Sequence, residues 1–527
     1  MSYYIGIDLG TSATKLMLTD EQGQILNVIS REYPLEFPHP GWSQQNPEHW
    51  LRAVCEGIPE LINGFDASLV KGIGAGGQMH GLVILDKDDA VIRPAILWND
   101  GRTAKQVDYL NNEIGTEKLI EWTANIAFAG FTAPKLLWVR ENELENFSRI
   151  AKVMLPKDYI NYCLTGVHSC DYSDASGMLL LDVRNKCWSR EMLDICGLRE
   201  EQMPELFESF EVTGTLLPGM ASMLGLPADV KVVAGAGDNA AAAIGTGTVG
   251  DGQCNISLGT SGTIFMSSDS FVNLDCPGIH NFAHADGGYH LMGCMLSAAS
   301  CNKWFYEDIL RTNDYNGMQS GITDDMLGRN HVYFLPYLMG ERSPINDTDA
   351  RGTFIGMTMD TSRDDMVQAV LEGVAFAIRD SFEEVSKTAG DAIDALDAEA
   401  SLAVKKSAAN VEAAAQTLAS KLSAMGITRS KICGGGAKSG LWLKIFANVL
   451  GIPLDIPETE QGPGYGGAIL AMVGCGEYAN CAEACGRLIH VKETVYPDRE
   501  LTCRYDEAYS RFRKIYPACR EMFKELI

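Results

Sequence analysis

Apolar residues near the start of the chain fall into three short runs that glycine and polar turns separate, at residues 4–8, 15–19 and 24–31. Such spacing predicts three successive β-strands. Helical periodicity then alternates with further apolar runs, at residues 70–74, 82–85 and 153–155. The N-terminal half is therefore predicted to be a mixed α/β domain that opens with a β-meander.

The second half repeats this order. Strands are predicted at residues 252–258, 263–267 and 289–295, and helices begin at Ala298 and Asp364. A glycine-rich stretch at residues 245–250 precedes the repeat and predicts a boundary between domains 1–249 and 250–527. A chain of 527 residues is also too long for one typical core. We expect two similar α/β domains that face each other across a central cleft.

Two turns of similar composition follow the first strand of each half. Residues 6–15 (GIDLGTSATK) return in degenerate form at residues 257–263 (SLGTSGT). Glycine, threonine and serine leave backbone N–H groups uncovered, as a phosphate requires. Ordinary glycine-containing hairpins are the alternative, but the duplication favours a pair of phosphate-binding hairpins. Only the first copy carries an acid, Asp8, which is placed to support a magnesium ion, whereas Ser257 stands in the second.

A carboxylate lies between the two hairpins, in the segment 235–243 (GAGDNAAAA). Asp238 before an alanine run is typical of a helix start. The small residues that precede it also leave room for a substrate hydroxyl, and both interpretations are compatible. In phosphoryl transfer, a carboxylate that accepts the proton of the attacking hydroxyl contributes about 10²–10⁴-fold in rate.

Glycine-rich segments also open two helices in the second half. Residues 434–440 (GGGAKSG) follow an apolar strand, and residues 462–468 (GPGYGGA) begin another helix. Ala437 stands where a Walker A loop requires glycine, so that motif is excluded. An adenosine site is one interpretation of the first segment, and a tight turn without a ligand is the other.

Polar, glycine-framed loops interrupt the first half at residues 76–81 (GGQMHG) and 98–102 (WNDGR). Their amide, carboxylate and imidazole groups suit a polyol, because each sugar hydroxyl needs both a donor and an acceptor. A structural histidine is the alternative for His80. The histidines lack the spacing of metal ligands, and no G-x-S-x-G elbow indicates acyl transfer.

Composition limits the classes of partner that we expect for this protein. The 43 Lys and Arg residues against 69 Asp and Glu residues give a net charge of −26, which disfavours nucleic acid and anionic membranes as partners. The 15 cysteines contain no C-x-x-C pair and indicate reduced thiols. No signal peptide or membrane span is predicted, so we expect a cytoplasmic protein. A homodimer stays open as an alternative to a monomer.

An alanine-rich stretch at residues 387–422 interrupts the alternation of predicted strands and helices. Its composition favours helix. A helical appendage on the second domain and a surface for a partner are both compatible with it.

Two long segments resemble the signatures of the FGGY carbohydrate kinases. The first is residues 130–142 (GFTAPKLLWVREN), and the second runs from 352–357 (GTFIGM) to 369–372 (AVLE). The resemblance covers residues 4 to about 517 and implies the duplicated ribonuclease-H-like fold of actin and hexokinase, with ATP and Mg2+. It assigns sugar binding and one phosphate hairpin to residues 1–249, and nucleotide binding to residues 250–527.

Within the family, the chain is most similar to the xylulokinases. The segments that carry this similarity are QMHG at residues 78–81, PAILWNDGR at 94–102, LPKDY at 155–159 and SDASG at 173–177. Glycerol kinases have an Arg-Glu pair where this chain has Met79 and His80. The resemblance implies that ATP phosphorylates O5 of D-xylulose, with Asp238 as proton acceptor. L-ribulose, L-xylulose and arabinitol are alternative substrates, and a non-catalytic sugar or nucleotide switch is an alternative of another class.

The site residues expected from these motifs and from the resemblance fall into three groups. The catalytic carboxylates are Asp238 and Asp8, and Asp8 is expected to hold Mg2+ through water. The sugar-binding residues are Gln78, Met79, His80, Trp98, Asn99, Asp100 and Asn239. The ATP-binding residues are Thr11, Ser12, Lys15, Gly259, Thr260, Gly435, Gly436, Ala437, Ser439 and Asn448.

Overall fold

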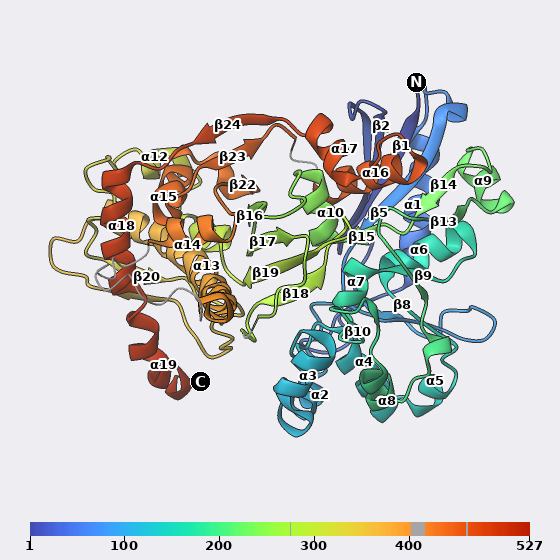
Figure 1. Ribbon diagram of the computed structural model, residues 1–527, viewed down its shortest axis with the longest axis horizontal. Coiled ribbons are helices and arrows are strands. Elements are labelled where there is room, and N and C mark those ends of the chain that lie inside the picture. The colour runs from blue at the N-terminus through green and yellow to red at the C-terminus, as the bar shows by residue number, and fades with distance from the viewer. Residues whose placement is uncertain (275, 402–416, 460–461, 527) are drawn as a thin grey trace.

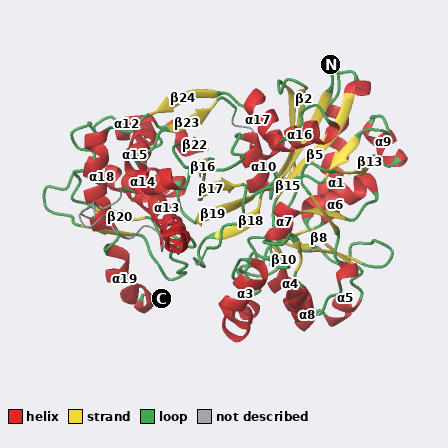
Figure 2. Ribbon diagram, in the orientation of Figure 1, coloured by secondary structure: helices red, strands yellow, loops and turns green. Residues whose placement is uncertain are grey.

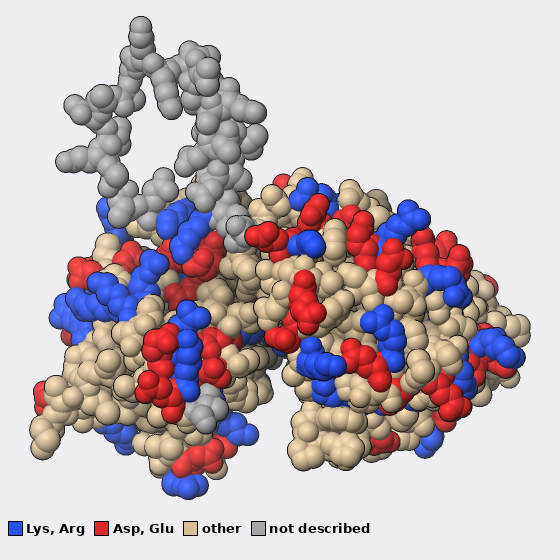
Figure 3. Space-filling view, turned by 90° about the horizontal axis from the view of Figure 1, so that it is seen from below, with Lys and Arg blue, Asp and Glu red and all other residues tan. Residues whose placement is uncertain are grey.

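The computed structural model describes residues 1–274, 276–401, 417–459 and 462–526, with the backbone alone over 388–401. The chain forms two lobes, each built on a seven-stranded mixed sheet (Figures 1 and 2). This confirms the predicted pair of α/β domains. In the space-filling view the surface is notched between the lobes, and acidic and basic side chains are intermixed on that face (Figure 3).

The N-terminal sheet has the strand order β13-β14-β5-β1-β2-β3. The first three strands form the predicted antiparallel meander, and β5 and β14 add in parallel beside β1. A short strand, β15, pairs with the end of β5. The bounds are β1 Tyr3–Leu9, β2 Ala13–Asp20, β3 Ile25–Glu32, β5 Val70–Gly77, β13 Val212–Thr215, β14 Lys231–Val233 and β15 Ala236–Gly237.

The C-terminal sheet repeats this topology in the order β24-β23-β22-β16-β17-β19, with β18 added at the edge. Its meander β16-β17-β19 is antiparallel, and β22 and β23 run parallel beside β16. The bounds are β16 Cys254–Leu258, β17 Gly262–Ser268, β18 His280–Ala283, β19 Tyr289–Met295, β22 Ser430–Cys433, β23 Leu454–Pro457 and β24 Val491–Val495. The two halves are therefore matching copies in which β16 takes the place of β1.

Both faces of strand β1 are covered, and its side chains point alternately into two hydrophobic cores. Ile5 and Ile7 pack toward α1 (Pro47–Leu61) and α6 (Pro156–Thr165), whereas Tyr4 packs toward α10 (Asp238–Gly245) and α16 (Gly462–Cys475). Alternation places Asp8 on the same face as Tyr4. The first hydrophobic run therefore directs this carboxylate toward the helix that begins at Asp238.

Helix α16 comes from the second half of the sequence but packs on β1 and β5 of the N-terminal sheet and on α10. Glycine makes this approach possible. A Cβ on Gly6 would lie 1.9 Å from the carbonyl oxygen of Gly464, and one on Gly466 would lie 1.8 Å from that of Ala241. Because no side chain separates these backbones, α16 fixes the position of α10 against the sheet.

The core of the C-terminal lobe surrounds α13 (Arg363–Ser401), α15 (Gly440–Leu450) and α18 (Arg499–Phe512). Within the predicted helical stretch 387–422, residues 387–401 continue α13. Residues 402–416 lie outside the described residues, and α14 (Leu418–Ala424) buries Leu418 and Leu422 in that core. Within the described residues, every helix is too short or too polar to cross a membrane.

The smaller elements complete the lobes. The paired short strands are β4 Gln44–Gln45 with β7 Ala95–Ile96, β6 Val83–Leu85 with β8 Lys152–Met154, β9 Ser169–Asp171 with β12 Glu205–Phe207, β10 Leu181–Asp182 with β11 Cys187–Trp188, and β20 Tyr333–Leu335 with β21 Thr353–Ile355. The remaining α-helices are α2 Ala104–Asp108, α3 Thr116–Thr123, α4 Thr132–Asn142, α5 Leu144–Ser148, α7 Tyr172–Ser176, α8 Arg190–Cys196, α9 Pro218–Leu224, α11 Ala299–Lys303, α12 Tyr315–Gln319, α17 Cys481–Leu488 and α19 Ile515–Glu525.

Candidate active site

The sheet register brings two acidic residues to one place. Asp8 on β1 lies opposite Gly76 of β5, and Ala236 of β15 lies opposite the same glycine from the other side. Two residues after Ala236, Asp238 begins α10. The glycines of β5 let its neighbours approach closely, since a Cβ on Gly76 would lie 2.9 Å from the Cβ of Ala241 in α10.

Burial raises the pKa of both carboxyl groups, and the charge of Asp8 adds to the shift of Asp238. The pKa of Asp238 rises to about 7, first through burial and then through the negative charge of Asp8, against a backbone hydrogen bond from Asn239. Burial raises the pKa of Asp8 to about 6, and the charge of Lys15 opposes this shift. A carboxylate that titrates near neutral pH is suited to accept a proton during a reaction.

A cavity of about 230 Å³ lies between the lobes, beside Asp238. The N-terminal lobe contributes the loops after β5 and β7, the residues just before α4 and the first turn of α10. The C-terminal lobe contributes the turn before β17, strands β17, β18 and β19, and a loop after β20. Its lining residues are Met79, His80, Trp98, Gly130, Phe131, Asp238, Asn239, Ser261, Thr263, His280, Met292, Cys294 and Arg342. Drug-sized ligands occupy about 300–1,000 Å³, so this cavity suits a smaller molecule.

His80 presents a neutral imidazole to this cavity. Its Nδ1 lies 2.7 Å from the carbonyl oxygen of Gly177, and its ring stacks on Phe131. Burial lowers the pKa of His80 to about 3, and the charges of Lys135 and Arg342 add to this effect. Because a carbonyl oxygen can only accept, Nδ1 carries the proton and Nε2 keeps a lone pair that can accept a bond from a hydroxyl group.

A second cavity, of about 510 Å³, lies in the C-terminal lobe. It extends from the turn between β16 and β17 to the glycine-rich turn before α15. Its lining residues are Thr260, Ala299, Ser300, Asn302, Lys303, Tyr315, Asn316, Gln319, Gly435, Gly436, Lys438, Ser439 and Trp442. A Cβ on Gly435 would meet no atom within 4 Å, so this glycine faces open space. The cavity can hold a ligand much larger than the first.

Five of the predicted sugar-binding and catalytic residues line the first cavity, namely Met79, His80, Trp98, Asp238 and Asn239. Gln78 is buried beneath it and donates to the carbonyl oxygen of Gly10, which braces the first hairpin turn. Asn99 is exposed and lines a different surface pocket. Asp100 forms a buried ion pair with Arg102, 2.7 Å long, away from the cavity.

The predicted nucleotide-binding residues are similarly divided. Thr260, Gly435, Gly436 and Ser439 line the second cavity, and Gly259 precedes Thr260 in the same turn. Ala437 lines a neighbouring hollow. Asn448 is fully buried in α15, where its Oδ1 accepts a hydrogen bond from the backbone of Asp498.

The first hairpin turn reaches the rim of the first cavity. The indole of Trp98 is 43% exposed, and its Nε1 donates to Thr11 Oγ1 at 2.9 Å. Ser12 is exposed beside Thr11, and Lys15 lies opposite Asp8 on β2. The turn thus connects Asp8 with Trp98 at the cavity.

Residues 3–245 match the N-terminal domain of the FGGY family of carbohydrate kinases, and residues 254–475 match its C-terminal domain. The chain belongs to the FGGY carbohydrate kinases. It is 38% identical to a xylulose kinase of Escherichia coli K12, over 97% of this chain and 98% of that protein.

Solved structures support the same assignment. A structure described as a xyloylose kinase from Brucella ovis is 37% identical, with a TM-score of 0.86, and covers 99% of this chain and 100% of that one. A gluconate kinase from Lactobacillus acidophilus is 26% identical, with a TM-score of 0.87 and complete coverage of both chains. The predicted family and fold are confirmed, and the protein is a sugar kinase that takes ATP as phosphoryl donor.

Several cavity residues of this FGGY kinase were absent from the sequence prediction. Arg342 and His280 line the smaller cavity, and Lys303, Gln319 and Trp442 line the larger one. His280 lies on β18 and Arg342 on a loop, and no motif marked Lys303 or Gln319 on their short helices; only Trp442 follows a glycine-rich segment that the sequence analysis considered. For Lys303 the repeated hairpin was a usable sequence signal. The backbone N–H of Ala298 donates to the carbonyl oxygen of Thr260 and thereby places α11, which ends at Lys303, at the second turn.

Proposed function

We propose that this FGGY kinase transfers the γ-phosphoryl group of ATP to the O5 hydroxyl of D-xylulose. The observation that carries the proposal is the cavity of about 230 Å³ that Asp238, Asn239, Met79 and His80 share. Its volume suits a pentose-sized ligand, and its polar groups can bind hydroxyls. The similarity to xylulose kinases over nearly the full chain supports this substrate.

Asp238 is the proton acceptor in this proposal. It begins α10 at the floor of the cavity, and its pKa of about 7 leaves a substantial fraction ionised at neutral pH. The carboxylate takes the proton of O5 as the oxygen attacks the γ-phosphorus atom, and the bond from that atom to the β,γ-bridging oxygen breaks to release ADP. His80 Nε2 accepts a hydrogen bond from a second hydroxyl, and Asn239 supplies both a donor and an acceptor.

ATP occupies the larger cavity, with its adenosine against Gly435 and Gly436 and its phosphates directed toward the two hairpin turns. Asp8 is suited to hold Mg2+, because such ions in kinase sites bind one or two carboxylates together with substrate phosphates. In the described residues, no cluster of three potential ligand side chains could hold a metal ion alone. When bound, Mg2+ neutralises charge on the phosphates.

A panel of sugars tests the substrate. Release of ADP should be fastest with D-xylulose and slower with L-xylulose, L-ribulose and arabinitol, because hydroxyl contacts in a closed pocket discriminate stereochemistry strongly. Gluconate belongs in the panel because a structural relative is described as a gluconate kinase. A higher kcat/KM for another sugar would change the substrate, and no ADP release with any sugar would favour a non-catalytic switch.

The nucleotide site predicts an effect of Gly435→Leu. A Cβ at this position meets no atom within 4 Å, so the added side chain would extend into the larger cavity. We expect the KM for ATP to rise by about tenfold or more, the loss of roughly 1.4 kcal/mol of binding, with the thermal midpoint and the KM for the sugar unchanged. Initial rates at varied ATP concentration measure this change.

Gly440→Leu is the matched control. A Cβ at Gly440 also meets no atom within 4 Å, but this glycine lines the neighbouring hollow and not the larger cavity. Equal KM values for ATP in the two variants would contradict the assignment of the nucleotide to the larger cavity.

The pair of carboxyl groups predicts the pH dependence of the rate. The proton acceptor must be ionised, and the pKa values of Asp238 and Asp8 lie at about 7 and about 6. We therefore expect kcat/KM to rise with pH along an acid limb near pH 7 and to level off above it. A profile that is flat from about pH 5.5 to 8 would contradict a base with the pKa of Asp238.

A further inference from the structure

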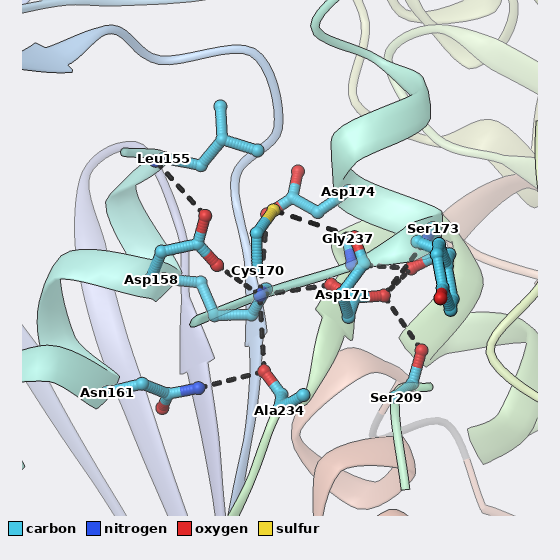
Figure 4. Close-up of polar contacts among 12 residues, drawn as sticks. Leu155, Asp158, Asn161, Cys170, Asp171, Ser173, Asp174, Ser209, Ala234 and Gly237 are labelled. Carbon is cyan, nitrogen blue, oxygen red and sulfur yellow. Dashed lines mark hydrogen bonds and ion pairs between the residues drawn. The ribbon is translucent and has the colours of Figure 1, made fainter. Parts of the chain in front are cut away.

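A buried ionic cluster lies behind the cavity, in the N-terminal lobe (Figure 4). Lys157, at the start of α6, forms ion pairs with Asp158 at 2.6 Å and with Asp171 at 3.0 Å, and Asp174 lies 3.8 Å away. All four side chains are fully buried. Buried ions lose much hydration energy, so packing alone does not account for an ammonium group and three carboxyl groups here.

The hydrogen bonds of this cluster converge on the segment that leads to Asp238. Lys157 Nζ and Asn161 Nδ2 both donate to the carbonyl oxygen of Ala234, at 3.2 and 2.8 Å. Ser173 donates its hydroxyl proton to Asp171 and accepts a bond from the backbone N–H of Gly237 at 3.1 Å. Gly237 is the residue immediately before Asp238.

Helix α7 (Tyr172–Ser176) connects this cluster to two other parts of the site. Immediately after it, the carbonyl oxygen of Gly177 accepts the bond from His80 that orients the imidazole. Ser176 Oγ accepts a bond from the backbone N–H of Ala283, on β18 of the other lobe, at 3.0 Å. The cluster therefore holds one short helix that contacts the loop before the base, the sugar-facing histidine and the opposite lobe.

We propose that the chain of contacts Lys157–Asp171–Ser173–Gly237 is a positioning device that sets the carboxylate of Asp238 for attack by the sugar hydroxyl. This inference rests on the proposed function, in which Asp238 is the proton acceptor. Burial raises the pKa of Asp174 well above the usual range against the charge of Lys157, and the charges of Asp158, Asp171 and, least, Asp238 add to the shift.

Two serines allow a matched test. Ser173 and Ser209 both donate to Asp171 Oδ2, the latter at 2.7 Å, but only the Ser173 hydroxyl contacts Gly237. We expect Ser173→Ala to lower kcat for D-xylulose by about tenfold to a hundredfold, because a displacement near 1 Å has an effect of this size. Its KM for ATP should change by less than about twofold, and Ser209→Ala should keep kcat within about twofold of the wild type.

The two variants are compared with Asp238→Asn, with thermal unfolding of each measured in parallel. Equal kcat values in Ser173→Ala and Ser209→Ala, with activity lost in Asp238→Asn, would overturn the positioning role alone. Activity retained in Asp238→Asn would overturn the assignment of the base and the positioning role with it. If Ser173→Ala does not fold, Asp171→Asn is measured instead, and a kcat equal to that of Ser209→Ala again contradicts the proposal.

Discussion

Asp238→Asn should retain the bound sugar but lose about 10²–10⁴-fold in kcat. Asparagine has nearly the same volume as aspartate and keeps a hydrogen-bonding side chain at the start of α10, but it cannot accept the proton of the attacking hydroxyl. Steady-state release of ADP gives kcat, and titration calorimetry gives the affinity for the sugar. The loss is expected in kcat because the missing interaction forms only in the transition state.

The control for this substitution is Asp364→Asn. Asp364 is also an acidic residue in the first turn of a helix, α13, but it belongs to the other lobe and does not line either cavity. Its kcat should stay within about twofold of the wild-type value, since removing a helix-terminal charge costs only about 0.3–1 kcal/mol of stability. A similar kcat in both variants would show that Asp238 acts only as a helix-terminal residue.

Gly466→Ala should destabilise the N-terminal lobe and also slow catalysis. The added Cβ would lie 1.8 Å from the carbonyl oxygen of Ala241, and a backbone atom cannot turn away as a flexible side chain can. Helix α16 must then separate from α10, which begins at Asp238. We expect a loss of about 3 kcal/mol in the free energy of unfolding, typical of severe overpacking, with a lower kcat at temperatures where the protein stays folded.

Gly486→Ala provides the comparison in α17. Gly486 is exposed, and a Cβ there meets no atom within 4 Å. Alanine in an open helical position is more favourable than glycine by about 0.5–1 kcal/mol. Thermal unfolding should therefore move in opposite directions in the two variants. A shift of equal sign and size would mean that the close approach of α16 and α10 does not hold the site together.

The meander of each lobe could be read from the sequence because short apolar runs and glycine turns are local signals. Asp238 was also recognisable, since the small residues around it are adjacent in the chain. Helix α16 was predicted as a helix, but its packing on β1 and β5 depends on contacts between residues more than 380 positions apart. No local pattern carries that information.

The predicted site residues also divide into those that the local sequence placed correctly and those that only the tertiary structure could place. Met79 and His80 follow a strand and lie in the cavity, as their glycine-framed loop suggested. Asp100 belongs to the same kind of polar loop but is paired with Arg102, and Asn448 supports α18 from within α15. Composition shows that a loop can bind hydroxyls, but only the tertiary structure shows which side chains already have partners.

Identification of the product formed from ATP and D-xylulose tests the central claim most directly. The purified protein is incubated with both compounds and Mg2+, and nuclear magnetic resonance locates the phosphorus on the sugar. The proposal predicts one product, D-xylulose 5-phosphate, formed in equal amount to ADP by the wild type and greatly slowed in Asp238→Asn. A phosphoryl group on another oxygen, or ADP formed without any sugar phosphate, would contradict it.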